Sequence, residues 1–142
     1  MDFASIKRMD WFELFGLPKR FLMDLDVLEK AYLQKQKIVH PDSWGNHSSK
    51  VTAQLSAYIN TVYTHLKTPS LRAEYMLKSV DAWPVPMYQE ILVEIFTLKS
   101  QEDSSCLHDK YQEAIIKFDD EFRQTQYVQA QHAYMYICYL KQ

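Results

Sequence analysis

The sequence predicts an all-α protein. Its 142 residues include only 2 Gly and 5 Pro, too few turn residues for a many-stranded β fold, in which a turn is expected about every 8–12 residues. Apolar residues make up 47% of the chain and recur at the three- and four-residue spacings of amphipathic helices. The 10 Tyr, 7 Phe and 6 Met indicate a core of bulky side chains.

The N-terminal region is expected to begin irregularly and then form one short helix. Residues 1–9 read as a loose lead-in. Asp10 can cap a short helix over residues 11–15, with Glu13 favourably placed in its first turn. Gly16 then supplies the left-handed residue that commonly ends a helix.

Two longer helices follow and should form a hairpin. The first covers Leu25–Val39 and the second about Ser49–Lys67. Each has one apolar stripe, as expected for the facing sides of an antiparallel helix pair. Between them stands His40-Pro41-Asp42. Because proline disfavours the α conformation of the residue before it, the first helix should end near His40, and the tripeptide should lie at the hairpin tip.

The remaining chain should form a short helix, a linker and a bundle. The short helix covers Leu71–Val80, after a break at Thr68-Pro69, and the linker covers residues 81–86, which contain two prolines. Three further helices should then pack as an antiparallel bundle: Met87–Ser100, Leu107–Phe122 and Thr125–Leu140. We therefore expect an N-terminal domain over 1–80, the linker, and a C-terminal domain over 87–142.

The charge distribution also indicates two parts. Residues 1–80 hold 11 Lys and Arg against 8 Asp and Glu, whereas residues 81–142 hold 5 against 10. This favours a protein with different partners at its two ends over a general nucleic-acid binder, which would be more basic. Cys106 and Cys138 show no zinc-ligand spacing and indicate a reducing compartment. Neither a signal-peptide core nor an apolar run of about 18 residues is visible, so we expect a cytoplasmic protein without a membrane span.

Several chemical roles are open to His40 and Asp42. A hydrolytic dyad would need a nucleophile and an oxyanion site, but only Ser43 is close and no GxSxG turn exists. A metal site would need a third ligand, and His47 lies in a polar loop without definite spacing. The tripeptide could also be a rigid contact point, or Asp42 could cap a helix with His40 as an ordinary loop residue.

The first bundle helix has two apolar faces, although a bundle buries only one stripe per helix. Ile91, Ile95 and Leu98 form one face. Leu92, Val93 and Phe96 form the other. The second face either packs against the N-terminal part or is an exposed patch that docks a partner protein. Two interpretations are also open for Lys30, Lys35 and Lys37 of the first long helix. They form either a solvated face or a basic strip that meets an acidic partner.

The tripeptide and its surroundings resemble a known family. His-Pro-Asp between two antiparallel helices is similar to the signature of J-domain co-chaperones. Three further patches resemble the HscB branch of that family: Trp-Phe-Glu-Leu-Phe-Gly-Leu-Pro at 11–18, Leu-Arg-Ala-Glu-Tyr-Met-Leu at 71–77, and Ile59-Asn60 with Tyr63 and Leu66. The acidic C-terminal segment agrees in layout.

This resemblance implies a bacterial-type co-chaperone of iron–sulfur cluster assembly. The J-domain would stimulate the ATPase of an HscA-type, DnaK-class chaperone, and the C-terminal bundle would bind the scaffold protein IscU and deliver it. The protein would be a monomer, would not itself be an enzyme and would need no cofactor or metal. The implied chaperone contacts are His40, Pro41, Asp42, Lys30, Lys35 and Lys37, and the implied scaffold contacts are Leu92, Val93, Phe96 and Tyr139.

The chain departs from the family pattern at several positions. Ser43 follows the tripeptide where the family usually has Lys, and Thr97 and Ser100 stand where acidic residues usually accompany the scaffold-binding patch. The last helix stops at Gln142, earlier than in typical members. These differences keep an alternative open, a J-domain adaptor with a degenerate chaperone contact or a different client.

Overall fold

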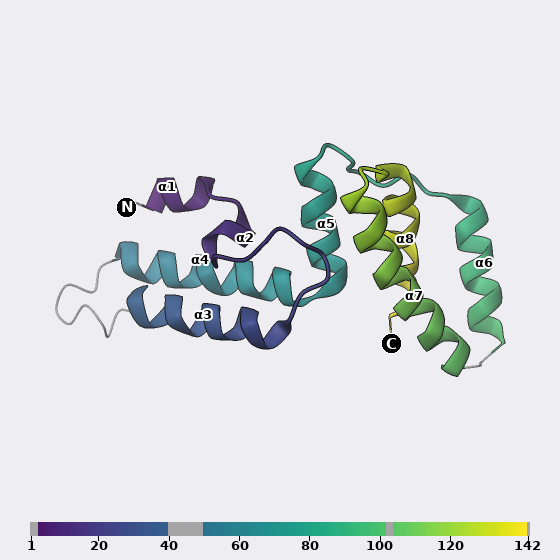
Figure 1. Cartoon of the computed structure of the whole chain (residues 1–142), viewed down its shortest axis with the longest axis horizontal. Coiled ribbons are helices and arrows are strands. Elements are labelled where there is room, and N and C mark those ends of the chain that lie inside the picture. The colour runs from purple at the N-terminus through teal and green to yellow at the C-terminus, as the bar shows by residue number, and fades with distance from the viewer. Residues whose placement is uncertain (1–2, 40–49, 102–103, 142) are drawn as a thin grey trace. The chain divides into compact units, whose positions relative to one another are not determined.

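All regular secondary structure is helical in the part of the chain that the computed structural model describes, residues 3–39, 50–101 and 104–141 (Figure 1). No strand occurs in these ranges, which confirms the all-α prediction. The helices are α1 Phe3–Arg8, α2 Trp11–Leu14, α3 Leu25–Val39, α4 Lys50–Lys67, α5 Pro69–Ser79, α6 Gln89–Ser100, α7 Ser104–Arg123 and α8 Tyr127–Leu140. None of the described helices is both long and apolar enough to cross a membrane.

The start of the chain is more ordered than predicted. The irregular lead-in expected over residues 1–9 is wrong for 3–8, which form α1. The Phe3 ring meets the edge of Tyr58 at 5.9 Å between centroids, an aromatic contact that anchors the short helix. The caps of α2 are confirmed. Asp10 Oδ2 accepts hydrogen bonds from the backbone N–H groups of the second and third residues that follow, at 3.0 and 3.4 Å, and Gly16 has φ +66°.

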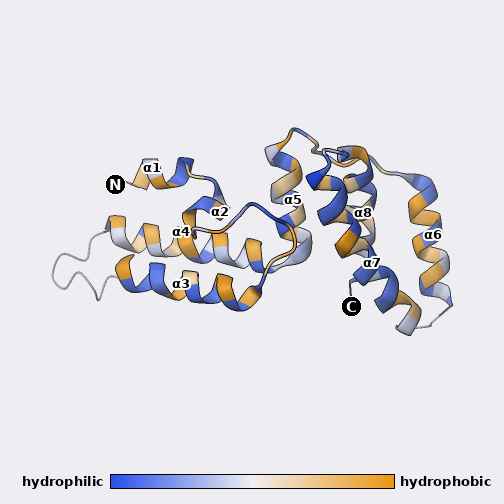
Figure 2. Ribbon diagram, in the orientation of Figure 1, coloured by the Kyte–Doolittle hydropathy of each residue, from blue (hydrophilic) through white to orange (hydrophobic). Residues whose placement is uncertain are grey.

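The first unit is built on the antiparallel pair α3 and α4 (Figure 1). Hydrophobic and hydrophilic residues alternate along both helices (Figure 2), which gives each a single buried stripe. Within that stripe Leu28, Ile59 and Val62 are buried. The spacing of apolar residues also predicts Leu25 and Val51 on these stripes, but both are exposed, near the starts of the two helices. α2 joins this core through buried Phe12.

The second unit contains four helices, because α5 packs against α8 and belongs with α6, α7 and α8. Proline is tolerated in the first turn of a helix, where its missing N–H would have no partner. Pro69 therefore begins α5 with only Thr68 between it and the end of α4. The predicted three-helix bundle is present, with α5 as an additional member, and the division between the units falls at Thr68/Pro69 and not in 81–86.

The predicted linker lies against α8. The side-chain amide of Gln131 donates to the Ala82 carbonyl oxygen at 2.8 Å. The ring of Trp83 meets Tyr134 at 5.5 Å in an edge arrangement. These contacts pack Ala82 and Trp83 of the connection between α5 and α6 against α8.

The second unit also includes the short segment Arg20–Leu22. The Phe21 ring packs on Phe118 of α7 at 4.5 Å between centroids. The guanidinium of Arg72, a buried residue of α5, lies 4.8 Å from the Phe21 centroid on the ring face. Burial lowers the pKa of Arg72 to about 10. Asp119 of α7 receives hydrogen bonds from both Arg20 and the Leu22 backbone, so polar and aromatic contacts together hold the segment.

Candidate functional site

The chain has two candidate contact surfaces, one on each unit. The first is the hairpin tip. His40, Pro41 and Asp42, which carry the predicted chaperone contact, lie outside the described residues, as do Ser43 and His47. The described helices show how the two ends that lead into this segment, Val39 of α3 and Lys50 of α4, are held together.

Polar side chains cross-link α3 and α4 close to the tip. Gln36 Nε2 donates to the Ser56 carbonyl oxygen and to Asn60 Oδ1, both at 3.1 Å. Ser56 Oγ donates back to Gln36 Oε1 at 2.7 Å. One turn earlier in α3 the Tyr32 ring stacks on Tyr63 at 4.0 Å between centroids, and the Tyr32 hydroxyl also donates to Asn60. This network was not predicted from the sequence, although Gln36 stands four residues after Tyr32, on the same face of the helix.

Replacing Gln36 by alanine should lower the free energy of unfolding by about 1–2 kcal/mol, because three hydrogen bonds between α3 and α4 are lost. Urea denaturation of the full chain would measure this change. Gln34→Ala is the matched control, since Gln34 is exposed on the same helix and carries the same change in helix propensity. Equal effects of the two substitutions would show that the cross-links contribute nothing.

The three lysines of α3 do not share one strip. Lys30 and Lys37 are exposed and lie seven residues apart, on one face of the helix. Lys35 is half-buried and stands about 140° around the helix from Lys30, at 100° per residue. Only Lys30 and Lys37 are therefore placed to form part of the same surface.

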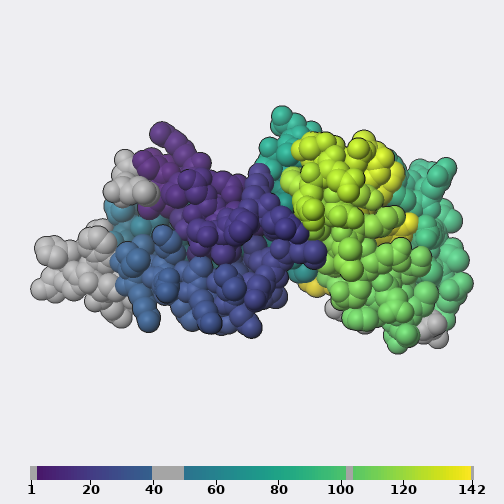
Figure 3. Space-filling view, in the orientation of Figure 1, coloured from purple at the N-terminus to yellow at the C-terminus, as the bar shows by residue number. Residues whose placement is uncertain are grey.

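The second candidate surface is the outer face of α6. Val93 is 65% exposed and Phe96 is 63% exposed, whereas Leu92 is half-buried. Ile95, from the other predicted face, is buried at 1% exposure, so that face is the one that packs in the bundle. In Figure 3 the residues of α6 form one edge of the second unit. We call Leu92, Val93 and Phe96 the α6 patch.

The pairing of α6 with α8 places Tyr139 near the end of the unit where Phe96 of the α6 patch lies. Tyr88, just before α6, donates from its hydroxyl to Gln131 Oε1 at 2.7 Å. Further along, the Tyr136 hydroxyl donates to Glu94 Oε2 at 2.6 Å. Residue numbers increase in the same direction along both helices, so α6 and α8 are parallel. Tyr139, one turn after Tyr136, is 40% exposed. Burial, together with the bond to Glu94, raises the pKa of Tyr136.

Neither unit presents an obvious reactive or metal-binding centre among the described residues. Within them no group of three or more His, Cys, Asp or Glu side chains is close enough to hold a metal ion. The metal hypothesis for His40, Asp42 and His47 concerns residues outside that part of the chain. Burial raises the pKa of the Cys138 thiol, which lowers the fraction of nucleophilic thiolate.

Comparison with known proteins identifies close relatives for part of the sequence. No family model matches the chain. The HscB co-chaperone homologue of Aliivibrio salmonicida is 43% identical over 72 residues, which make up 49% of this chain and 42% of the relative. The homologue of Vibrio vulnificus is 42% identical over the same length. The match thus spans less than half the length of these relatives.

Solved structures match over nearly the whole chain. The crystal structure of the human co-chaperone protein HscB superposes with a TM-score of 0.79 at 23% identity, covering 94% of this chain and 77% of the human one. The chaperone HscB from Vibrio cholerae gives a TM-score of 0.78 at 24% identity, covering 93% and 91%. At these identities the likeness establishes the fold.

In sequence over 72 residues, and in fold over the helical hairpin and the bundle that follows it, the chain is similar to proteins of the co-chaperone class. Within that class, the resemblance to the HscB type that the tripeptide and its flanking patches predicted is confirmed. Likeness in sequence covers 72 residues, and likeness in fold covers more than nine-tenths of the chain.

Proposed function

We propose that this protein stimulates the ATPase of an HscA-type, DnaK-class chaperone and delivers the iron–sulfur scaffold protein IscU to it. The observation that carries the proposal is the α6 patch, because two large apolar side chains more than 60% exposed on one helix are expected at a protein-binding surface. The named relatives agree with a co-chaperone role. In this role the protein converts no substrate itself.

On the chaperone side, the hairpin would act by favouring one of two chaperone states, which requires a differential contact with them. His40 and Asp42 would make directional polar contacts, and Pro41 would hold them in fixed mutual geometry, so that little entropy is lost on binding. The cross-links of Gln36 would keep the helix ends in register. Lys30 and Lys37, with Lys35 in a lesser role, would steer the tip towards an acidic surface in a salt-dependent manner.

On the scaffold side, the α6 patch would form the apolar centre of a small interface, with Tyr139 beside it. Two neighbouring hydroxyls are already engaged. Thr97 Oγ1 donates to the Val93 carbonyl oxygen, and Ser100 Oγ donates to the Thr97 carbonyl oxygen, both at 2.8 Å. Positions 97 and 100 therefore offer neither charge nor an unengaged hydroxyl hydrogen to a partner, and affinity would depend mainly on apolar burial.

The double substitution Leu92→Ala with Phe96→Ala should weaken scaffold binding by roughly 30-fold or more, since truncating central apolar anchors costs at least about 2 kcal/mol. Isothermal titration calorimetry with IscU measures this. Ile116→Ala is the matched control, because Ile116 is another exposed apolar residue, 59% exposed, on α7. Unchanged affinity of the double variant would remove the α6 patch from the interface.

The function as a whole is tested by the ATPase rate of an HscA-type chaperone with this protein, with the scaffold, and with both. We expect the two together to stimulate more than the product of their separate effects. The engaged hydroxyls of Thr97 and Ser100 favour one alternative, a J-domain adaptor for a different client or with a degenerate chaperone contact. Capture of the chaperone without any affinity for the scaffold would support that alternative.

A further inference from the structure

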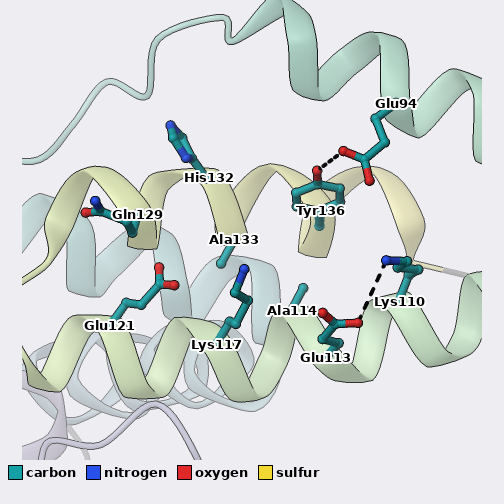
Figure 4. A pocket seen from close by; sticks show the side chains of 10 residues that line it. All are labelled: Glu94, Lys110, Glu113, Ala114, Lys117, Glu121, Gln129, His132, Ala133 and Tyr136. Carbon is teal, nitrogen blue, oxygen red and sulfur yellow. Dashed lines mark hydrogen bonds and ion pairs between the residues drawn. The ribbon is translucent and has the colours of Figure 1, made fainter.

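The second unit contains a groove that none of the proposed contacts uses. It has a volume of about 310 Å³ and lies between α6, α7 and α8 (Figure 4). Ala114 of α7 and Ala133 of α8 line it, each only 4% exposed. Small side chains at a helix contact leave room between the longer side chains on either side, which here form the walls.

The groove is long enough for a stretch of polypeptide. Its wall on α7 runs from Lys110 to Glu121, which at 1.5 Å per residue is about 16 Å. An extended peptide of about five residues, at 3.3 Å each, has that length. Lys110, Glu113, Lys117 and Glu121 recur at three- and four-residue intervals and so share one face of α7.

Some charged groups of the groove already have partners. Glu94 accepts the Tyr136 hydroxyl, and Lys110 lies 4.0 Å from the Glu113 carboxylate. With Lys117 and Glu121, the groove holds three carboxylates and two ammonium groups. Since Lys110 is paired with Glu113, the remaining charged side chains carry a net negative charge.

In the part of the chain that the structure describes, Lys117 and Glu121 form no ion pair. Figure 4 shows them side by side on α7, both pointing towards α8. Among the described residues, Glu121 Oε2 is out of contact with solvent and accepts no hydrogen bond. A buried acceptor without a donor is unfavourable, and more so when it is charged. If the Glu121 side chain turns towards the groove, a ligand that brings an N–H donor to its carboxylate recovers that cost on binding.

We propose that this groove binds a short extended basic peptide segment, whose Lys or Arg side chain donates to the Glu121 carboxylate. A cationic side chain satisfies the buried oxygen, and the excess of carboxylates favours it over an anion. The backbone lies along α7 and α8, above the two alanines. The proposal is independent of the scaffold contact, because the α6 patch contributes no residue to the groove.

The test is an NMR titration of the full chain with the pentapeptide acetyl-GGRGG-amide. A second peptide carries citrulline, the neutral isostere of arginine, in place of Arg. We expect amide shifts confined to α7, α8 and the middle of α6 around Glu94, and binding of the citrulline peptide at least tenfold weaker. Equal binding of both peptides overturns the proposal. So does the absence of any shift up to a peptide concentration of about 10 mM, which corresponds to a binding free energy of under 3 kcal/mol.

Three variants locate the contact. Glu121→Gln should weaken the arginine peptide at least fivefold. Lys117→Gln should tighten it about twofold or more, because a like charge is removed from the groove. Glu90→Gln carries the same chemical change at an exposed α6 residue outside the groove and should have no effect. The spectra report whether each variant is folded. Unchanged binding by Glu121→Gln, or weaker binding by Lys117→Gln, would contradict a cationic ligand at Glu121.

Discussion

Replacing His40 by glutamine should abolish stimulation of the chaperone ATPase, a loss of at least tenfold, while the helical content of the protein stays the same. The reason is that a signalling contact depends on directional hydrogen bonds, and the amide of glutamine cannot reproduce the positions of the two imidazole nitrogens. The fold should persist because the core of the first unit is formed elsewhere, by Leu28, Ile59 and Val62.

The measurement is steady-state ATP hydrolysis by an HscA-type chaperone with increasing amounts of each variant. His47→Gln is the matched control, because it makes the same substitution at another histidine of the segment between α3 and α4, five residues before Thr52. This variant should stimulate like the parent. Circular dichroism of both variants checks the fold. Normal stimulation by His40→Gln would show that the tripeptide is not the contact.

The sequence was sufficient where local signals agree. The bounds of α3 were predicted as Leu25–Val39 and observed there, because an apolar stripe, a polar start and a following proline all indicate the same segment. The structure also identifies the residue that caps the start of α3. Asp24 Oδ1 accepts from the N–H groups of Asp26 and Val27 at 2.9 and 3.4 Å, so Asp24 is the cap.

Contacts between distant segments could not be predicted in this way. The assignment of α5 to the second unit depends on its packing against α8, and no periodicity in α5 itself names that partner. The same is true of Arg20 and Asp119, which are 99 residues apart and form an ion pair at 3.1 Å. A single sequence offers no local sign of such a pair.

The two candidate surfaces illustrate the same difference. The exposed positions of Val93 and Phe96 agree with the second apolar face that helical periodicity indicated. Leu92 is partly covered, which depends on how α6 packs. The groove was not predicted, because it arises from the register that brings Ala114 opposite Ala133. Facing small residues on consecutive bundle helices were the available signal.

Replacing Asp119 by alanine should destabilise the protein by about 2–3 kcal/mol, because a buried carboxylate that accepts several hydrogen bonds is lost. Its side chain is 3% exposed. It accepts from Arg20 Nη2 at 3.1 Å, from the Leu22 backbone N–H at 3.2 Å and from Arg123 Nη1 at 3.4 Å. Both arginine side chains are about half exposed, so water can solvate them after the change, which keeps the loss below that of a fully buried pair.

Urea denaturation of Asp119→Ala at neutral and acidic pH tests both the size of the effect and its origin. Burial raises the pKa of Asp119, but the hydrogen bonds from Arg20, Leu22 and Arg123 outweigh it and hold the pKa below its ordinary value. A carboxyl whose pKa is lower in the folded state stabilises the protein above its unfolded pKa, about 3.9, and loses that contribution as the pH falls through its folded value. The difference between parent and variant should therefore shrink below about pH 4.

Asp120→Ala, at the exposed neighbouring position, should change stability by less than about 0.5 kcal/mol at any pH. Equal effects of the two substitutions, or a difference that does not depend on pH, would mean that the charge of Asp119 does not hold the segment Arg20–Leu22 in place.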